Sequence, residues 1–119
     1  MGKLTTHVLD TAQGCPAAGV PLQLWRYDRE SGDRQLLAKA VTNLDGRTDV
    51  PLLINEQLKV GFYEIIFFVK DYFDRQPLNL PDLPFLTEVP VRFTIADSDA
   101  NYHIPLLVSP WSYTTYRGS

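Results

Sequence analysis

The sequence predicts an all-β protein built as a sandwich or barrel, and three observations lead to this fold class. Short runs rich in β-branched and aromatic residues recur along the chain, and turn residues separate them. Residues 61–69 are dominated by such side chains, which is typical of a strand. Residues 89–96 alternate between apolar and polar positions, as expected of a strand with one buried face. Together, the spacing of seven or eight such runs favours a β-sandwich.

The predicted strands follow one another with recognisable turns between them. In order, they are residues 4–9, 22–27, 35–42, 47–50, 61–69, 89–96, 102–109 and 111–116. A turn at residues 11–16 follows the first strand, and Ser31 with Gly32 closes the second. Residues 43–46 read Asn-Leu-Asp-Gly, which is a strong hairpin signal because Gly46 can adopt a positive φ.

One short helix is predicted at residues 71–76. Asp71 is a suitable N-terminal cap, and Pro77 would end the helix because proline cannot continue it. The proline-punctuated segment 77–84 is expected to be an ordered loop.

Length and composition indicate one globular domain spanning residues 1–119. Apolar residues make up 45% of the chain and charged residues 21%, which excludes a disordered protein. The net charge is −3 and the basic residues are scattered, so no nucleic-acid partner is expected. Neither a targeting sequence nor a membrane span is visible, so we expect a cytoplasmic protein without a membrane partner. Cys15 is the only cysteine and is expected to be inert.

The two histidines, His7 and His103, lie in the first and seventh predicted strands. Because side chains alternate along a strand, each histidine points away from the more aliphatic face, which we expect to form the core. Leu9 and Leu107 share the histidine faces, so these faces are not plainly solvated. We therefore expect a homo-oligomer with the histidines at or near a subunit interface.

Motif spacing narrows the chemistry that these residues could perform. The histidines lack metal-ligand spacing, and neither a GxSxG elbow nor a glycine-rich phosphate loop is present. Histidine general acid/base chemistry with a nearby arginine remains. Arg47 follows a tight turn and can bind a planar carbonyl or urea-like group through two parallel hydrogen bonds. Taken singly, each residue also has a plainer interpretation, as a structural histidine or a solvated arginine.

The last four residues, Tyr116, Arg117, Gly118 and Ser119, form a polar segment directly after the last predicted strand. They offer a phenol, a guanidinium, an unrestricted backbone and a hydroxyl beside a carboxylate, which suits a closed polar pocket. An extension past Ser119 would then occupy space that the substrate needs. The alternative interpretation is a frayed terminus.

Three segments of the sequence together resemble one known family. They are residues 4–17, which contain LTTHVLDT and GCPA, residues 42–47 (TNLDGR), and residues 102–119, which contain YHIPLLVSPWSY and end in YRGS. The chain resembles the transthyretin-like 5-hydroxyisourate hydrolases of purine catabolism over essentially its whole length. The last four residues are the most diagnostic, since transthyretin itself lacks this ending and the histidine pattern.

The resemblance implies a transthyretin-like sandwich of two four-stranded sheets with one short helix. It also implies a homotetramer, a dimer of dimers, with active sites in the channel between the dimers. The implied reaction is hydrolysis of 5-hydroxyisourate to 2-oxo-4-hydroxy-4-carboxy-5-ureidoimidazoline in urate degradation, without metal or organic cofactor. The implied catalytic residues are His7, Arg47, His103 and Ser119, and all four would also bind the substrate together with Tyr116, Arg117 and Gly118.

The residue types and the resemblance suggest the same mechanism. One histidine would take a proton from water, while the other would orient the water or protonate the leaving nitrogen. Arg47 would bind the heterocycle and stabilise the developing oxyanion. Tyr116 would pack on the flat substrate, Gly118 would allow a close approach, and Ser119 would hydrogen-bond a histidine or the substrate. Which histidine is the base stays open. The alternative function is a transthyretin-like small-ligand carrier, which the polar residues of the site disfavour.

Overall fold

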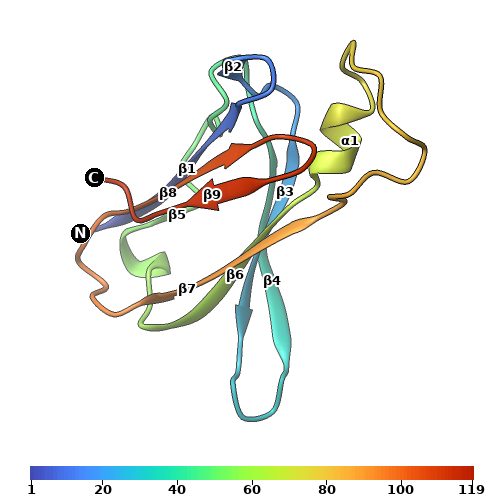
Figure 1. The fold of residues 1–119 in the computed structure, drawn as a ribbon. Helices are drawn as coiled ribbons and strands as arrows, with labels where there is room; N and C mark the ends of the chain where they lie inside the picture. Colours follow the sequence, from blue (N-terminus) through green and yellow to red (C-terminus); the bar gives the residue numbers. More distant parts are fainter.

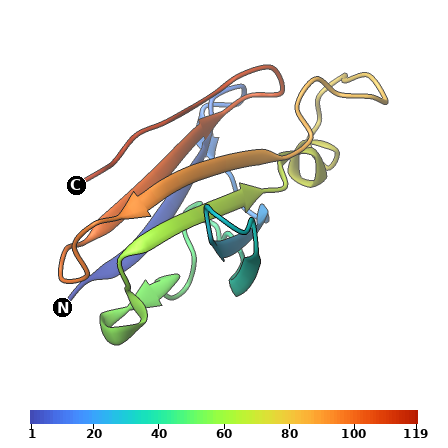
Figure 2. The same ribbon diagram turned by 90° about the horizontal axis from the view of Figure 1, so that it is seen from below.

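The computed structural model describes residues 1–119 and consists of two β-sheets packed face to face (Figures 1 and 2). One sheet has the strand order β2-β1-β8-β9, with β5 paired to the start of β1, and the other has the order β4-β3-β6-β7. The strands are β1 (Lys3–Asp10), β2 (Cys15–Pro16), β3 (Pro21–Tyr27), β4 (Arg34–Val41), β5 (Leu53–Ile54), β6 (Gly61–Phe67), β7 (Val89–Ile95), β8 (Tyr102–Val108) and β9 (Tyr113–Thr115). The predicted all-β sandwich is confirmed, with five strands rather than four in the first sheet.

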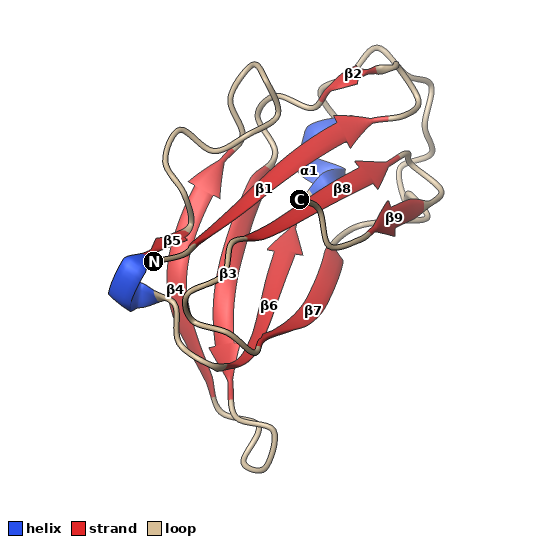
Figure 3. Ribbon diagram, turned by 90° about the vertical axis from the view of Figure 1, so that its left-hand side faces the viewer, coloured by secondary structure: helices blue, strands red, loops and turns tan.

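The pairing of β1 with β8 is the only parallel contact between strands. Its register runs from Leu4 opposite Tyr102 to Asp10 opposite Val108. Figure 3 shows this sheet in front of the other one, with the C-terminal segment returning to lie at β8. The first strand of the chain, the eighth strand and the C-terminus therefore meet in one place.

The core lies between the two sheets and follows the predicted alternation. In β1 and β8 every second residue is buried, while His7 and His103 lie on the opposite face and are only half-buried. The largest fully buried side chains are those of Tyr63, Phe67, Leu4, Leu22, Leu24, Ile65, Ile95, Leu106, Val8, Val20, Val69 and Val89. Both histidines thus point away from the core, as predicted.

The single α-helix, α1, spans Val69–Phe73 and so begins two residues before the predicted start at Asp71. Asp71 lies inside the helix, and no side chain caps its N-terminus. Val69, Tyr72 and Phe73 are buried, so packing against the core sets the position of this short helix. Neither α1 nor the 3₁₀ turn Asn55–Gln57 has the length and apolar character needed to cross a membrane.

The strand predicted at residues 47–50 does not form. Arg47 makes a single bridge to His7, and the chain pairs with β1 again only at β5. The Thr48 hydroxyl donates to the Val50 carbonyl (2.6 Å), and Pro51 has no N–H to contribute, so both interrupt regular pairing. Two smaller differences are that Cys15–Pro16 pairs as β2 within the predicted turn, and that the last strand is shorter than predicted.

Candidate functional site

The outer face of the first sheet carries both histidines. In the parallel register of β1 and β8, Thr5 lies opposite His103 and His7 lies opposite Pro105. The two histidines are therefore on adjacent strands, two residues out of register, and on the same face. Residues that the sequence places at opposite ends of the chain come together here because the first and eighth strands pair.

The turn before Arg47 fixes this arginine beside His7. The turn is closed by the Gly46 N–H donating to the Asn43 carbonyl (2.9 Å), and Gly46 has the predicted positive φ, at 77°. The Gly46 carbonyl accepts the Val8 N–H (2.7 Å), which anchors the turn to β1. A methyl group at Gly46 would collide with the Val8 carbonyl oxygen, so the backbones can approach only at a glycine.

The protonation of the His7 ring is constrained by its one hydrogen bond. Its Nε2 lies 2.9 Å from the carbonyl oxygen of Asp45. A carbonyl oxygen can only accept, so Nε2 must carry the proton. In the neutral ring this leaves Nδ1 with the free lone pair.

The His103 ring is held through its other nitrogen. Nδ1 lies 2.8 Å from the hydroxyl oxygen of Thr5, directly across the strand pair. Burial lowers the pKa of His103 below its usual value of 6.5, and the positive charge of Arg47 and the nearby His7 lower it further. His103 is therefore neutral at neutral pH and able to accept a proton.

The C-terminal segment is ordered against β8 rather than frayed. The Gly118 N–H donates to the His103 carbonyl (2.7 Å), and the two residues form a β-bridge. A methyl group at Gly118 would lie 2.6 Å from Cδ2 of the His103 ring, so the backbone passes very close to this imidazole. The Arg117 guanidinium lies over the Tyr102 ring, 4.2 Å from its centroid, and donates to the Asn101 carbonyl (3.1 Å). Arg117 therefore anchors the segment to the start of β8.

A cavity of about 460 Å³ opens at this place. It is lined by Lys3, Thr5, Thr6, Arg47, Thr48, Asp49, Val50, Pro51, His103 and Ser119. Three of the four predicted catalytic residues, Arg47, His103 and Ser119, thus share one cavity, and the fourth, His7, is bridged to Arg47. Tyr116 and Arg117 instead line a separate cavity of about 410 Å³ between the edges of β7 and β9.

Sequence reasoning assigned no role to Thr5, Lys3 or Asp49, which also line this cavity. The alternation pattern does place Thr5 on the same face of β1 as His7. Its position opposite His103, however, depends on the parallel register of β1 and β8, for which the sequence carries no local signal. Lys3 and Asp49 gave no motif that sets them apart from solvated charges.

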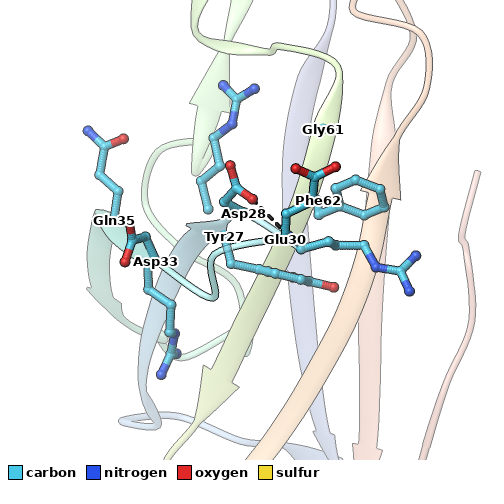
Figure 4. A pocket seen from close by; sticks show the side chains of 10 residues that line it. Tyr27, Asp28, Glu30, Asp33, Gln35, Gly61 and Phe62 are labelled. Atoms are coloured by element: carbon cyan, nitrogen blue, oxygen red, sulfur yellow. Dashed lines mark hydrogen bonds between the residues drawn. The ribbon is translucent and has the colours of Figure 1, made fainter.

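The largest cavity, about 770 Å³, lies elsewhere, where the β3–β4 turn meets the start of β6 (Figure 4). Two of its charged side chains, those of Arg34 and Asp28, are engaged in bonds within the structure. Arg34 pairs with Glu64 (2.7 Å), and the Asp28 carboxylate accepts the N–H groups of Ser31 and Glu30, which lowers the pKa of Asp28. It contains no histidine, cysteine or serine. The cavity beside His103 is therefore the better candidate for a catalytic site.

Neither place offers a metal centre, because no group of three or more His, Cys, Asp or Glu side chains is arranged to hold an ion.

Comparison with known proteins adds independent information. The model of the HIUase/Transthyretin family matches residues 4–118. The chain is 54% identical over 118 residues to the 5-hydroxyisourate hydrolase of Halalkalibacterium halodurans, covering 99% of this chain and 98% of that protein. It is 32% identical to the 5-hydroxyisourate hydrolase structure from Klebsiella pneumoniae, with a TM-score of 0.80 and full coverage of both chains. It is also 29% identical to Sparus aurata transthyretin, with a TM-score of 0.84, covering 98% of this chain and 96% of that one.

Proposed function

Because this chain belongs to the HIUase/Transthyretin family, we propose that it is a 5-hydroxyisourate hydrolase. The product would be 2-oxo-4-hydroxy-4-carboxy-5-ureidoimidazoline, which places the reaction in urate degradation. The main support for the proposal is that Arg47, His103 and Ser119 line one cavity, with His7 bridged to Arg47. These residues supply a proton acceptor and a cation, which suit ring opening by water, and a hydroxyl that can hydrogen-bond the substrate.

His103 is the general base in this proposal. Its lowered pKa keeps it neutral at neutral pH, so that it can take a proton from water as the water oxygen bonds to a ring carbonyl carbon. When the ring C–N bond breaks, the same imidazolium returns the proton to the leaving nitrogen. The net change is addition of one water molecule, and the protein ends the cycle as it began.

Arg47 and His7 bind and orient in this scheme. Arg47 can donate two parallel hydrogen bonds to a carbonyl or urea-like edge and stabilise the oxyanion, an effect of about 3 kcal/mol in a water-poor site. His7, with its Nε2–H bound to the Asp45 carbonyl, presents Nδ1 as an acceptor for the attacking water or a substrate N–H. Ser119 lines the cavity, and the Gly118 backbone lies against the His103 ring.

The carrier alternative fits the cavity less well. Carrier sites for apolar ligands are lined mainly by apolar side chains. Most residues around the His103 cavity are polar or charged. A planar, polar heterocycle is the better match.

We further propose that the histidine face is covered by other copies of the chain in a homotetramer, a dimer of dimers. Leu9 and Leu107 share this face with the histidines and are half-buried, while Trp111 and Tyr113 next to it are exposed. Such apolar side chains are better accommodated in an interface than in water. Sedimentation velocity at micromolar concentration should show tetramers, and a monomer alone would contradict this arrangement.

A direct assay tests the enzymatic proposal. 5-Hydroxyisourate is generated from urate with urate oxidase, the protein is added, and the ultraviolet absorbance of the intermediate is followed. We expect decay faster than the spontaneous reaction, with His103→Asn and His7→Asn each slower than the wild type and with altered pH–rate profiles. An unchanged decay rate with the wild-type protein would refute the function, and full activity in both variants would refute the mechanism.

A further inference from the structure

Thr5 lines the His103 cavity but has no role in the proposed mechanism. It lies in β1 directly opposite His103 in the parallel register, although the two are 98 positions apart in the chain. Its hydroxyl oxygen is 2.8 Å from His103 Nδ1, and this is the only hydrogen bond of the Thr5 side chain. Both residues line the cavity, and both are half-buried.

The geometry points to Thr5 as a positioning residue, whose hydroxyl accepts the Nδ1–H of His103 and so leaves the Nε2 lone pair for the reacting water. This inference rests on the proposed function. With Nδ1 occupied by Thr5, Nε2 is the only ring nitrogen available to a molecule in the cavity. On the other side the backbone at Gly118 packs against the ring near Cδ2, so the imidazole is held between two elements.

The direction of this hydrogen bond decides whether His103 can act as a base. If the hydroxyl donated to Nδ1, the neutral ring would carry its proton on Nε2 and would have no lone pair facing the cavity. If the hydroxyl accepts, the proton resides on Nδ1 and Nε2 is free to take a proton from water. A hydroxyl is capable of either role, so Thr5 can also follow the ring as it becomes an imidazolium and returns to neutral.

Several charged groups face this pair and enter its pH dependence. Arg47 and His7 lower the pKa of His103, after the larger effect of burial. Lys3 and Asp49 line the same cavity, and Ser119 closes it. A hydrogen bond that the imidazolium donates to Thr5 favours the charged form, so its loss should lower the pKa of His103 further.

Three variants test whether Thr5 positions the His103 ring through its hydroxyl or only packs against it. Thr5→Val keeps the shape and the β-branched character of the side chain but removes the hydroxyl, whereas Thr5→Ser keeps the hydroxyl. Thr94→Val is the matched control, because Thr94 is an exposed strand residue in the other sheet with no side-chain hydrogen bond.

The ¹⁵N shifts of the imidazole nitrogens report the tautomer and the pKa of His103. Assignment is simple because the chain has two histidines and the His7→Asn variant leaves one.

We expect wild-type His103 to carry its proton on Nδ1 above its pKa, and Thr5→Val to move that proton to Nε2 and to lower the pKa. In the decay assay Thr5→Val should reduce kcat about tenfold without a change in KM, with the acid limb of the pH–rate profile at lower pH. Thr5→Ser should restore both readouts, and Thr94→Val should match the wild type. A wild-type ring protonated on Nε2, or a Thr5→Val ring still protonated on Nδ1, overturns the inference. Because the tautomer is measured without substrate, it distinguishes this outcome from a failure of the proposed function.

Discussion

Replacing Gly46 with alanine tests how the turn places Arg47 beside His7. The substitution meets two obstacles in the structure. The backbone has φ 77°, a left-handed conformation that costs a non-glycine residue about 1–2 kcal/mol. The added Cβ would also lie well within 3.0 Å of the Val8 carbonyl oxygen, so the two backbone segments must separate.

That separation strains two backbone hydrogen bonds. The Val8 N–H donates to the Gly46 carbonyl (2.7 Å), and the Ala17 N–H donates to the same Val8 carbonyl that the methyl group would strike (2.9 Å). At about 1 kcal/mol for each bond, the contact adds about 2 kcal/mol to the backbone penalty. We therefore expect Gly46→Ala to lower the free energy of unfolding by about 3–4 kcal/mol, a large share of the 5–15 kcal/mol typical of a domain.

Gly32 offers a matched control in the β3–β4 turn. It has nearly the same φ, at 79°, but a Cβ built there meets no atom within 4 Å. Gly32→Ala should therefore cost only the backbone penalty of about 1–2 kcal/mol. The difference between the two variants isolates the contact with β1.

Urea unfolding followed by circular dichroism measures both free energies, and all proteins must be compared at one concentration because assembly would add to stability. The decay assay should show that Gly46→Ala also loses activity, since Arg47 moves with the turn, while Gly32→Ala retains it. Equal loss of stability in the two variants would show that the contact with Val8 is not the reason why position 46 requires glycine.

Four further predictions concern the site itself. Gly118→Ala should reduce activity, because the added methyl group would lie 2.6 Å from the His103 ring. The free energy of unfolding should change by no more than about 0.5 kcal/mol, because the backbone at this position carries no positive-φ penalty. Enzyme kinetics and urea unfolding measure the two effects. Arg47→Gln should raise the pKa of His103 only part of the way toward 6.5, because burial, the larger cause of the lowered pKa, remains. An NMR titration measures this pKa. An unchanged value would contradict the electrostatic effect of Arg47 on His103. In the wild type, folding favours the neutral form of His103, because the folded state lowers the pKa of this residue. This contribution to the free energy of unfolding is fully present above pH 6.5 and is lost as the pH falls through the folded-state pKa. Deleting residues 117–119 should abolish turnover while leaving the sandwich folded, and an active truncated protein would show that the tail is dispensable.

The sequence predicted those features that depend only on local geometry. Alternation along residues 4–9 and 102–109 placed His7 and His103 on faces turned away from the core, and the buried positions of β1 and β8 confirm this. The turn at residues 43–46 was recognisable because its last residue must adopt a positive φ. Helix α1 was misplaced by two residues because buried side chains, not the cap at Asp71, determine where it begins.

The family resemblance named the site residues, but it did not say how they are arranged. In the structure Arg47, His103 and Ser119 line one cavity, whereas Arg117 lies over Tyr102 and Tyr116 lines a different cavity. The role of Arg117 as a substrate-binding residue therefore stays a prediction, beside its observed contact with the start of β8. The strand predicted at 47–50 is instead an irregular stretch between the bridge of Arg47 to His7 and the pairing of β5 with the start of the same strand, β1.

By itself, the sequence determined that the histidine-bearing faces of β1 and β8 point away from the core and that the chain turns at residues 43–46, because these features follow from side-chain alternation and backbone freedom within a few residues. Only the tertiary structure decided that β1 pairs with β8 in a parallel register, so that Thr5 lies opposite His103 and Arg47 is bridged to His7. Pairing across 98 positions depends on burying the common face of both strands against the second sheet, which is a property of the whole core. The hydrogen bond between Thr5 and His103 therefore depends on a strand pairing that no local pattern encodes.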